Sequence, residues 1–199
     1  MASVIIWSPA SISLSTCVLD GTTVNGNVTV TSNGSLMATG AMVKGNVQSN
    51  SSGRMIVISG GVYGNNIQTN NAALVQISGA SANNGNVQVQ GTTGRTEVVN
   101  DTIKGDVEIQ NGNPKVKVTG DKVGGDVQVQ GDTGVGSSSI SNNTIGGNLA
   151  IKNNNAGGGS SLTVSLNSVS NNLQCQGNAP PPTGSGNSAK QKSGQCEKL

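Results

Sequence analysis

Short stretches of alternating apolar and polar residues recur along most of the chain at a nearly constant interval. The apolar residues that open these stretches are Val28, Val47, Ile67, Val87, Val107, Val127, Leu149 and Leu173. The steps between them are 19, 20, 20, 20, 20, 22 and 24 residues. Alternation predicts strands with one buried and one exposed face, and a step of about 20 residues is typical of one coil of a β-solenoid.

Stacking such coils brings equivalent residues into columns that run along the solenoid. The column just before the opening apolar residue contains only Asn and Asp: Asn27, Asn46, Asn66, Asn86, Asp106, Asp126, Asn148 and Asn172. At a coil spacing of about 4.8 Å, this column can form a ladder of side-chain hydrogen bonds. The column just after the apolar residue is rich in Gln. It should face solvent, where it either binds sugars through hydrogen bonds or only solvates the strands.

These repeats predict an all-β protein, a single-stranded parallel β-helix of about eight coils. A right-handed winding is expected from the usual handedness of parallel crossovers. We expect residues 23–176 to form the coils and residues 1–22 to form an N-terminal cap around Trp7 and Pro9, because the ends of a solenoid need capping. Residues 177–199 are rich in Pro, Gly and Ser and are expected to form a C-terminal tail.

The three cysteines bear on how the tail is held. Cys175 lies in the last repeat and Cys196 lies near the end of the tail. A disulfide between them would close a loop of about 20 residues and stabilise the fold by about 3 kcal/mol. Cys17 is then left over near the N-terminal cap. A tail pinned by a disulfide favours a secreted, extracellular protein.

Composition excludes several classes of function. The chain has no His, one Tyr and one Trp, which excludes Ser-His-Asp and Cys-His catalysis and His-ligated zinc. A net charge of +2 with so few aromatic residues argues against binding to nucleic acid. No apolar run approaches the roughly 18–20 residues needed to cross a membrane. No Gly-rich loop joins a strand to a helix, so we expect no nucleotide and no other cofactor.

The end of the chain resembles a known group of proteins. The segments Asn172-Leu173-Gln174-Cys175, 178–184, Gly186-Asn187 and Gly194-Gln195-Cys196 are similar to the ends of small secreted β-helix proteins of the actinomycete type. In size and character, the chain resembles the low-molecular-weight hyaluronan lyases of Streptomyces. This resemblance implies a secreted polysaccharide lyase that acts on an anionic polymer containing uronic acid, hyaluronan above all. It supplies no catalytic motif to match.

Such a lyase must neutralise the uronate carboxylate, remove the neighbouring proton and protonate the leaving oxygen. Tyr63, the only tyrosine, interrupts an aliphatic column, and alignment of the repeats places Asn83 at the same position in the next coil. We therefore predict that Tyr63 and Asn83 are catalytic, with Tyr63 transferring the proton. The alternative is that Tyr63 only fills a wide coil and that the asparagines close turns.

The other predicted site residues are amides and cations from the same part of the chain. The amides are expected to bind the uronate, and the cations to attract the polyanion and to lower the pKa of Tyr63. These substrate-binding residues are Asn65, Asn66, Asn84, Lys44, Arg54, Arg95 and Lys104.

A second group is acidic, and its three members are Asp106, Glu108 and Asp126 on neighbouring coils. Carboxylates placed in this way could hold calcium or form the pair of a retaining hydrolase. The alternative is that each Asp only replaces an Asn in the ladder.

Two classes of function remain. One is the secreted hyaluronan lyase, which the irregularity around Tyr63 and the resemblance favour. The other is a non-catalytic extracellular solenoid with a structural, adhesive or carbohydrate-binding role.

Overall fold

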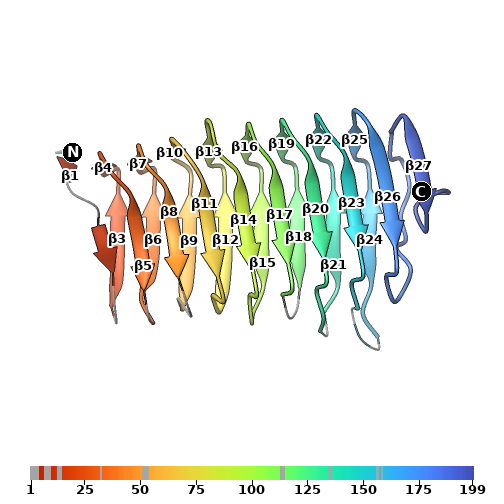
Figure 1. Ribbon diagram of the computed structural model, residues 1–199, viewed down its shortest axis with the longest axis horizontal. Coiled ribbons are helices and arrows are strands. Elements are labelled where there is room, and N and C mark those ends of the chain that lie inside the picture. Colours follow the sequence, from red (N-terminus) through yellow and green to blue (C-terminus); the bar gives the residue numbers. More distant parts are fainter. Residues whose placement is uncertain are drawn as a thin grey trace.

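Three parallel β-sheets wind into a solenoid in the computed structural model, with no helix among the residues that it describes (Figure 1). It describes residues 5–6, 10–12, 15–31, 33–50, 54–112, 115–134, 136–155, 157 and 159–199. Trp7 and Pro9, the predicted cap residues, lie outside this set. The predicted parallel solenoid of about eight coils is confirmed, and its right-handed winding stays a prediction.

Each coil visits the three sheets in the same order. Sheet A holds the short strands β1 (Ile5–Ile6), β4 (Thr23–Val24), β7 (Met42–Val43), β10 (Val62–Tyr63), β13 (Ser81–Ala82), β16 (Thr102–Ile103), β19 (Lys122–Val123), β22 (Thr144–Ile145) and β25 (Ser168–Val169). Sheet B holds β2 (Ala10–Ile12), β5 (Val28–Thr31), β8 (Val47–Asn50), β11 (Ile67–Asn70), β14 (Val87–Gln90), β17 (Val107–Gln110), β20 (Val127–Gln130), β23 (Leu149–Lys152), β26 (Asn172–Gln176) and β27 (Gln191–Gly194). Sheet C holds β3 (Thr16–Asp20), β6 (Ser35–Thr39), β9 (Met55–Ser59), β12 (Leu74–Ser78), β15 (Thr96–Val99), β18 (Val116–Thr119), β21 (Ser138–Ser141) and β24 (Leu162–Ser165).

The register of the strands stacks equivalent residues directly above one another. In sheet B, Ile67 pairs with Val47 on one side and with Val87 on the other. These opening residues of the sheet B strands are fully buried, as are the strand residues two positions further along, such as Val30 and Ile109. The alternation seen in the sequence therefore separates a dry Val, Ile and Leu core from an outer face of polar residues.

The segments predicted as cap and tail both carry strands of the same three sheets. β1, β2 and β3, which lie within residues 1–22, pair in parallel with β4, β5 and β6. At the other end, β27 pairs in parallel with β26. Single bridges also join Thr183 to Thr163 and Ser188 to Ser168. The hydrogen bonding of the solenoid thus extends into both segments.

The predicted disulfide between Cys175 and Cys196 is confirmed. The two Cα atoms lie 5.1 Å apart, and both side chains are fully buried against the last coils. Cys17 is free, half-buried and packed against the core near the N-terminal end. The disulfide therefore ties the C-terminal segment to the body of the solenoid.

Candidate functional site on sheet B

Tyr63 lies inside the solenoid. Its side chain is 0% exposed, and its neighbours in the sheet A column are Val43 and Ala82. The hydroxyl has no hydrogen-bond partner, and burial raises the pKa of Tyr63 well above its usual value. A polymer in solvent cannot contact this oxygen, and ionising it as a base is unfavourable. This position agrees with the alternative in which Tyr63 only fills a wide coil, because the ring lies beside the small Ala82 in the core.

Asn83 does not share the Tyr63 column, so the predicted alignment at this point is wrong. Tyr63 pairs with Ala82, and Asn83 follows one position later, where its N–H donates to the carbonyl of Tyr63 at 2.9 Å. The coil that begins at Ala82 needs one more residue than its neighbour to reach the core residue of sheet B. The extra residue lies in the turn around Asn84, which is exposed.

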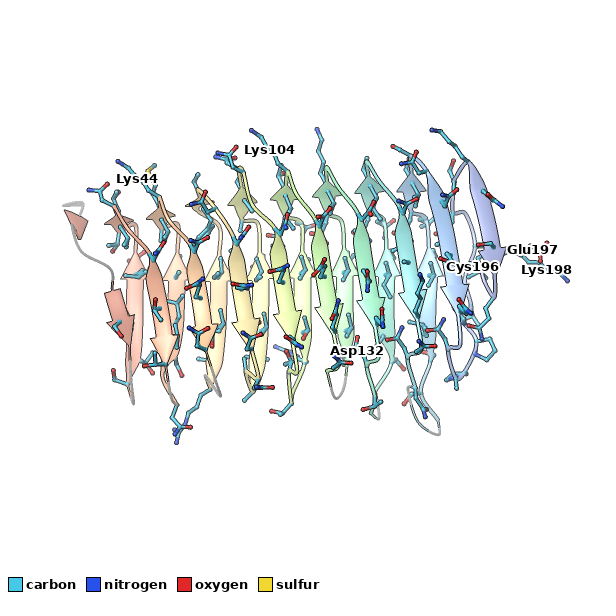
Figure 2. The ribbon with its side chains drawn as sticks, in the orientation of Figure 1. Lys44, Lys104, Asp132, Cys196, Glu197 and Lys198 are labelled. Atoms are coloured by element: carbon cyan, nitrogen blue, oxygen red, sulfur yellow. A yellow bond between two sulfur atoms is a disulfide. The ribbon has the colours of Figure 1, made fainter. Side chains whose placement is uncertain are left out.

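The predicted substrate-binding residues fall into two groups on opposite edges of sheet B. Lys44 and Lys104 lie where sheet A turns into sheet B, and Figure 2 shows both along that edge. The four predicted asparagines lie at the equivalent turns of two successive coils: Asn65, Asn66, Asn83 and Asn84. Arg54 and Arg95 instead precede sheet C strands, beyond the far end of the sheet B strands. Arg95 pairs there with Glu97 at 3.6 Å, so the arginines do not join the lysines.

The predicted ladder of Asn and Asp runs along the edge between sheets A and B. Each side-chain oxygen accepts the backbone N–H of its counterpart in the next coil, for example Asn86 Oδ1 from Asp106 at 2.9 Å. Asp106 Oδ1 accepts from Asp126 at 2.8 Å, and Asp126 Oδ1 accepts from Asn148 at 2.7 Å. Asp serves here as well as Asn because this bond needs only an acceptor. The two aspartates therefore occupy the positions expected if each Asp only replaces an Asn in the ladder.

Glu108 belongs to a different column, in the middle of sheet B. Its carboxylate accepts from Gln88 Nε2 at 3.2 Å. Within the described part of the chain, no group of three or more His, Cys, Asp or Glu side chains is arranged to hold a metal ion. Calcium binding by the acidic group therefore gains no geometric support.

Two parallel rows of side chains cover the outer face of sheet B, and most of them are amides. The first row is Thr29, Gln48, Gln68, Gln88, Glu108, Gln128, Ala150 and Gln174. The second row is Thr31, Asn50, Asn70, Gln90, Gln110, Gln130, Lys152 and Gln176. We call these sixteen residues the amide face.

Three neighbouring amides of the first row are linked to one another. Gln68 Nε2 donates to Gln88 Oε1 at 2.7 Å, and Gln48 Nε2 lies 3.5 Å from Gln68 Oε1. Through Gln88, the chain of bonds reaches Glu108. Such a chain holds the long side chains in fixed directions along the solenoid axis.

Shallow hollows lie among these rows. One of about 170 Å³ is lined by Gln68, Asn70, Gln88, Val89, Gln90, Glu108 and Gln110. Beside it, a hollow of about 360 Å³ is lined by Asn70, Asn71, Gln90, Gly91 and Asn111. Their lining side chains offer many donors and acceptors but no aromatic ring. Chemically, this face can form hydrogen bonds with a long polar ligand.

Two further ladders run through the interior, and sequence reasoning missed both. The first follows the corner between sheets C and A: Asp101, Asp121, Asn143, Asn167 and Asn187, all buried. The second follows the corner between sheets B and C: Asp132, Asn154, Asn178 and Gln195. The available signal for the first was an Asp or Asn two residues before each sheet A core residue, as in Asn143 before Ile145.

No protein family, curated protein or solved structure matches the chain. Within the described ranges, no helix has the length and apolar character needed to cross a membrane. The geometry of the amide face is therefore the basis on which a function can be argued.

Proposed function

We propose that the protein binds an extended polysaccharide along the amide face. The observation that carries this proposal is the register of sheet B, which aligns Gln and Asn side chains of successive coils in two straight rows. Successive rungs are separated by about 4.8 Å. A chain of sugar rings laid along the solenoid axis would meet a new pair of amides at each coil.

Amides suit sugar hydroxyl groups because each amide both donates and accepts hydrogen bonds. A single exposed bond of this kind contributes a net of only about 0.5–1.5 kcal/mol. Many bonds in line can still hold a polymer, because the later contacts form within the same complex. The links from Gln48 through Gln68 to Gln88 restrict these side chains before binding, which lowers the entropy cost of ordering them.

Hyaluronan is the first ligand to test, because the resemblance to hyaluronan lyases implies it. Lys44 and Lys104 on the adjoining edge add positive charge that would attract a polyanion. The disulfide supports an extracellular role, since such bonds persist in oxidising surroundings. Binding of hyaluronan should weaken with added salt, whereas binding of a neutral polysaccharide should not.

The test is affinity electrophoresis or calorimetry with hyaluronan and with a neutral polysaccharide. The variant carries Gln68→Ala, Gln88→Ala and Gln90→Ala, which removes three of the polar side chains that line the central hollows. We expect the dissociation constant to rise about tenfold or more, as the loss of three weak hydrogen bonds implies.

The matched control carries Gln76→Ala, Ser139→Ala and Thr163→Ala, all on one outward column of sheet C. This control should bind as the wild type does. An equal loss in both triple variants, or no binding of any polysaccharide by the wild type, would contradict the proposal.

The same hyaluronan samples also test the lyase hypothesis. Elimination produces an unsaturated uronate that absorbs ultraviolet light, so a steady rise in absorbance would add catalysis to binding. The base would then have to be an exposed group such as Lys44 or Lys104, because the Tyr63 hydroxyl is buried. Binding without absorbance change would favour the non-catalytic alternative.

A further inference from the structure

The asparagines of the two inner ladders repeat one pattern of hydrogen bonds. Asn143 Oδ1 accepts the N–H of Asp121 at 2.9 Å. Its Nδ2 donates to the Val118 carbonyl and to Asn167 Oδ1, both at 2.9 Å. Asn154 does the same between the Val129 carbonyl and Asn178 Oδ1. Each buried amide therefore uses its acceptor toward the preceding coil and its two donors toward both neighbouring coils.

Asp121 and Asp132 occupy the rungs just before Asn143 and Asn154 and keep only half of the pattern. Asp121 Oδ1 accepts the N–H of Asp101 at 2.8 Å, and Asp132 Oδ1 accepts the N–H of Gly112 at 2.6 Å. Their second oxygens, Oδ2 in each case, are buried without a hydrogen-bond partner. The two residues are only 2% and 7% exposed, so bulk solvent has little access to them.

The register of the strands identifies what these second oxygens should meet. The acceptor carbonyls of the first ladder follow one column, Val118, Ile140 and Val164, and Val98 is the preceding member. In the second ladder, the acceptors Val129 and Ile151 are preceded by Ile109. A carboxylate oxygen facing a carbonyl oxygen is repulsive, whereas a protonated carboxyl group can donate its O–H to it.

We propose that Asp121 and Asp132 are neutral carboxylic acids in the folded protein, donating O–H to the carbonyls of Val98 and Ile109. Their ionisation then makes the middle coils a pH-sensitive element of the fold. Protonated, each carboxyl group imitates the asparagine of the next rung. Ionised, each one puts an unpaired negative charge inside the solenoid, which destabilises the coils around it.

The surroundings of both groups agree with this proposal. Burial raises the pKa of Asp121 to about 8 from the ordinary 3.8, and the nearby Asp101 carboxyl adds to the rise, while the backbone N–H groups of Asp101 and Thr119 oppose it. Burial raises the pKa of Asp132 to about 7, against the N–H bond from Gly112. The ladder neighbours Asn143 and Asn154 carry no charge.

The charged side chains on the adjoining strands do not enter the interior. Glu97 and Lys117 lie on the outward column of sheet C, and Lys122 is exposed on sheet A. Near Asp132, Lys115 is exposed and Lys152 lies on the outer face of sheet B. No described cation is therefore buried beside either carboxyl group to stabilise its ionised form.

The direction of the pH dependence follows from these raised values. A group that holds its proton more tightly when folded contributes its full stabilisation below the unfolded pKa. For Asp121 and Asp132, that stabilisation is complete below about pH 4 and is lost as the pH rises through about 8 for Asp121 and about 7 for Asp132. Asp101 contributes less to this pH dependence, because both its oxygens accept backbone N–H bonds and burial raises its pKa only to about 6.

The experiment compares the melting temperature of the wild type with that of a double variant carrying Asp121→Asn and Asp132→Asn, from pH 4 to pH 9. We expect the wild type to lose melting temperature between pH 4 and pH 8. The double variant should lose much less and should melt about 5 °C or more above the wild type at pH 8. A second readout, the carboxyl ¹³C shifts of the wild type, should show two aspartates that titrate near neutral pH.

The matched control is Asp106→Asn, which makes the same change in the outer ladder between sheets A and B, where Asp106 is partly exposed. This control should keep the pH dependence of the wild type. A wild-type melting temperature that is flat from pH 4 to pH 8, or a double variant that keeps the full slope, would overturn the proposal. So would carboxyl shifts showing both groups ionised at pH 5.

One outcome would replace protonation of Asp132 by a bound cation. A small cavity of about 20 Å³, large enough for a single water-sized species, is lined by Asp132, Ser138, Asn154 and Asn155. Figure 2 shows Asp132 near the turns that follow sheet B. Calcium chloride that raises the melting temperature of the wild type at pH 8, but not that of Asp132→Asn, would assign a cation to this carboxylate and overturn its protonation.

Discussion

The two ends of the solenoid close the same inner corners with different chemistry. In the N-terminal coils, Ala41, Ala72 and Ala80 line the corners and bring only a methyl group. In the C-terminal coils, the equivalent positions hold buried asparagines such as Asn143 and Asn167, each with its hydrogen bonds satisfied. One backbone path thus accepts either small apolar residues or a continuous polar ladder.

This difference shows where the two halves are vulnerable. Removing a methyl group from a corner costs the fold little stability, because the methyl group contributes only its own burial. An amide in a ladder has partners in the coils on both sides, so its removal leaves several buried polar groups unsatisfied. The middle coils, where Asp101, Asp121 and Asp132 begin the ladders, combine the polar design with incomplete pairing.

Removing a ladder amide should give the largest effect. Asn167 accepts from Asn143 and donates to the Ile140 carbonyl and to Asn187 Oδ1. We expect Asn167→Ala to lower the free energy of unfolding by about 3–5 kcal/mol, because it leaves buried partners on both sides. The measurement is urea denaturation followed by circular dichroism.

Ala41→Gly is the matched change in the N-terminal half, since Ala41 and Asn167 both stand two residues before a sheet A core residue. It should cost only about 1 kcal/mol. Equal losses in the two variants would show that the ladder contributes no more than a methyl group, and the comparison would fail.

The repeat in the sequence predicted the sheets and the core because strand alternation depends only on which residues are apolar. The corners were harder to predict. Asn at a turn has the same sequence signal whether it is partly exposed, as Asn148 is, or buried, as Asn143 is. Only the path of the backbone around the corner decides which of the two faces the interior. The inner ladders and their aspartates were therefore missed, although the outer ladder was predicted.

The candidate site shows the same limit. The Gln column could be identified as outward-facing, but whether it binds sugar cannot be read from an alternating pattern. Tyr63 attracted a catalytic hypothesis because it interrupts an aliphatic column, and that column is the core. The register at Asn83 was misplaced by one residue because turn length varies between coils.

Loss of the disulfide should give the next largest effect and should be confined to the C-terminal half. The bridge joins positions 21 residues apart and ties β27 to the last coils. Replacing Cys175 and Cys196 by Ala should cost about 2–4 kcal/mol. Hydrogen exchange should show faster opening in β26 and β27 and unchanged protection in β6 and β9.

Cys17→Ala is the control for that prediction, because Cys17 is free and only half-buried. We expect it to cost no more than about 1 kcal/mol. If the variant without the disulfide exchanged faster throughout the chain, the two halves would unfold together, and the separation argued above would be wrong.

The smallest effect is expected at Tyr63, in the half without inner ladders. Tyr63→Phe removes a buried hydroxyl that has no partner and keeps the ring that fills the coil beside Ala82. Because an unsatisfied buried hydroxyl costs free energy, the variant should be as stable as the wild type or more stable by about 1 kcal/mol. Polysaccharide binding should not change, since the amide face lies on the opposite side of the sheet B backbone from the core. A loss of about 2 kcal/mol or more would show that the hydroxyl has a partner in solution. Loss of binding or of any lyase activity would show that Tyr63 reaches the surface, and would restore it as a candidate catalytic residue.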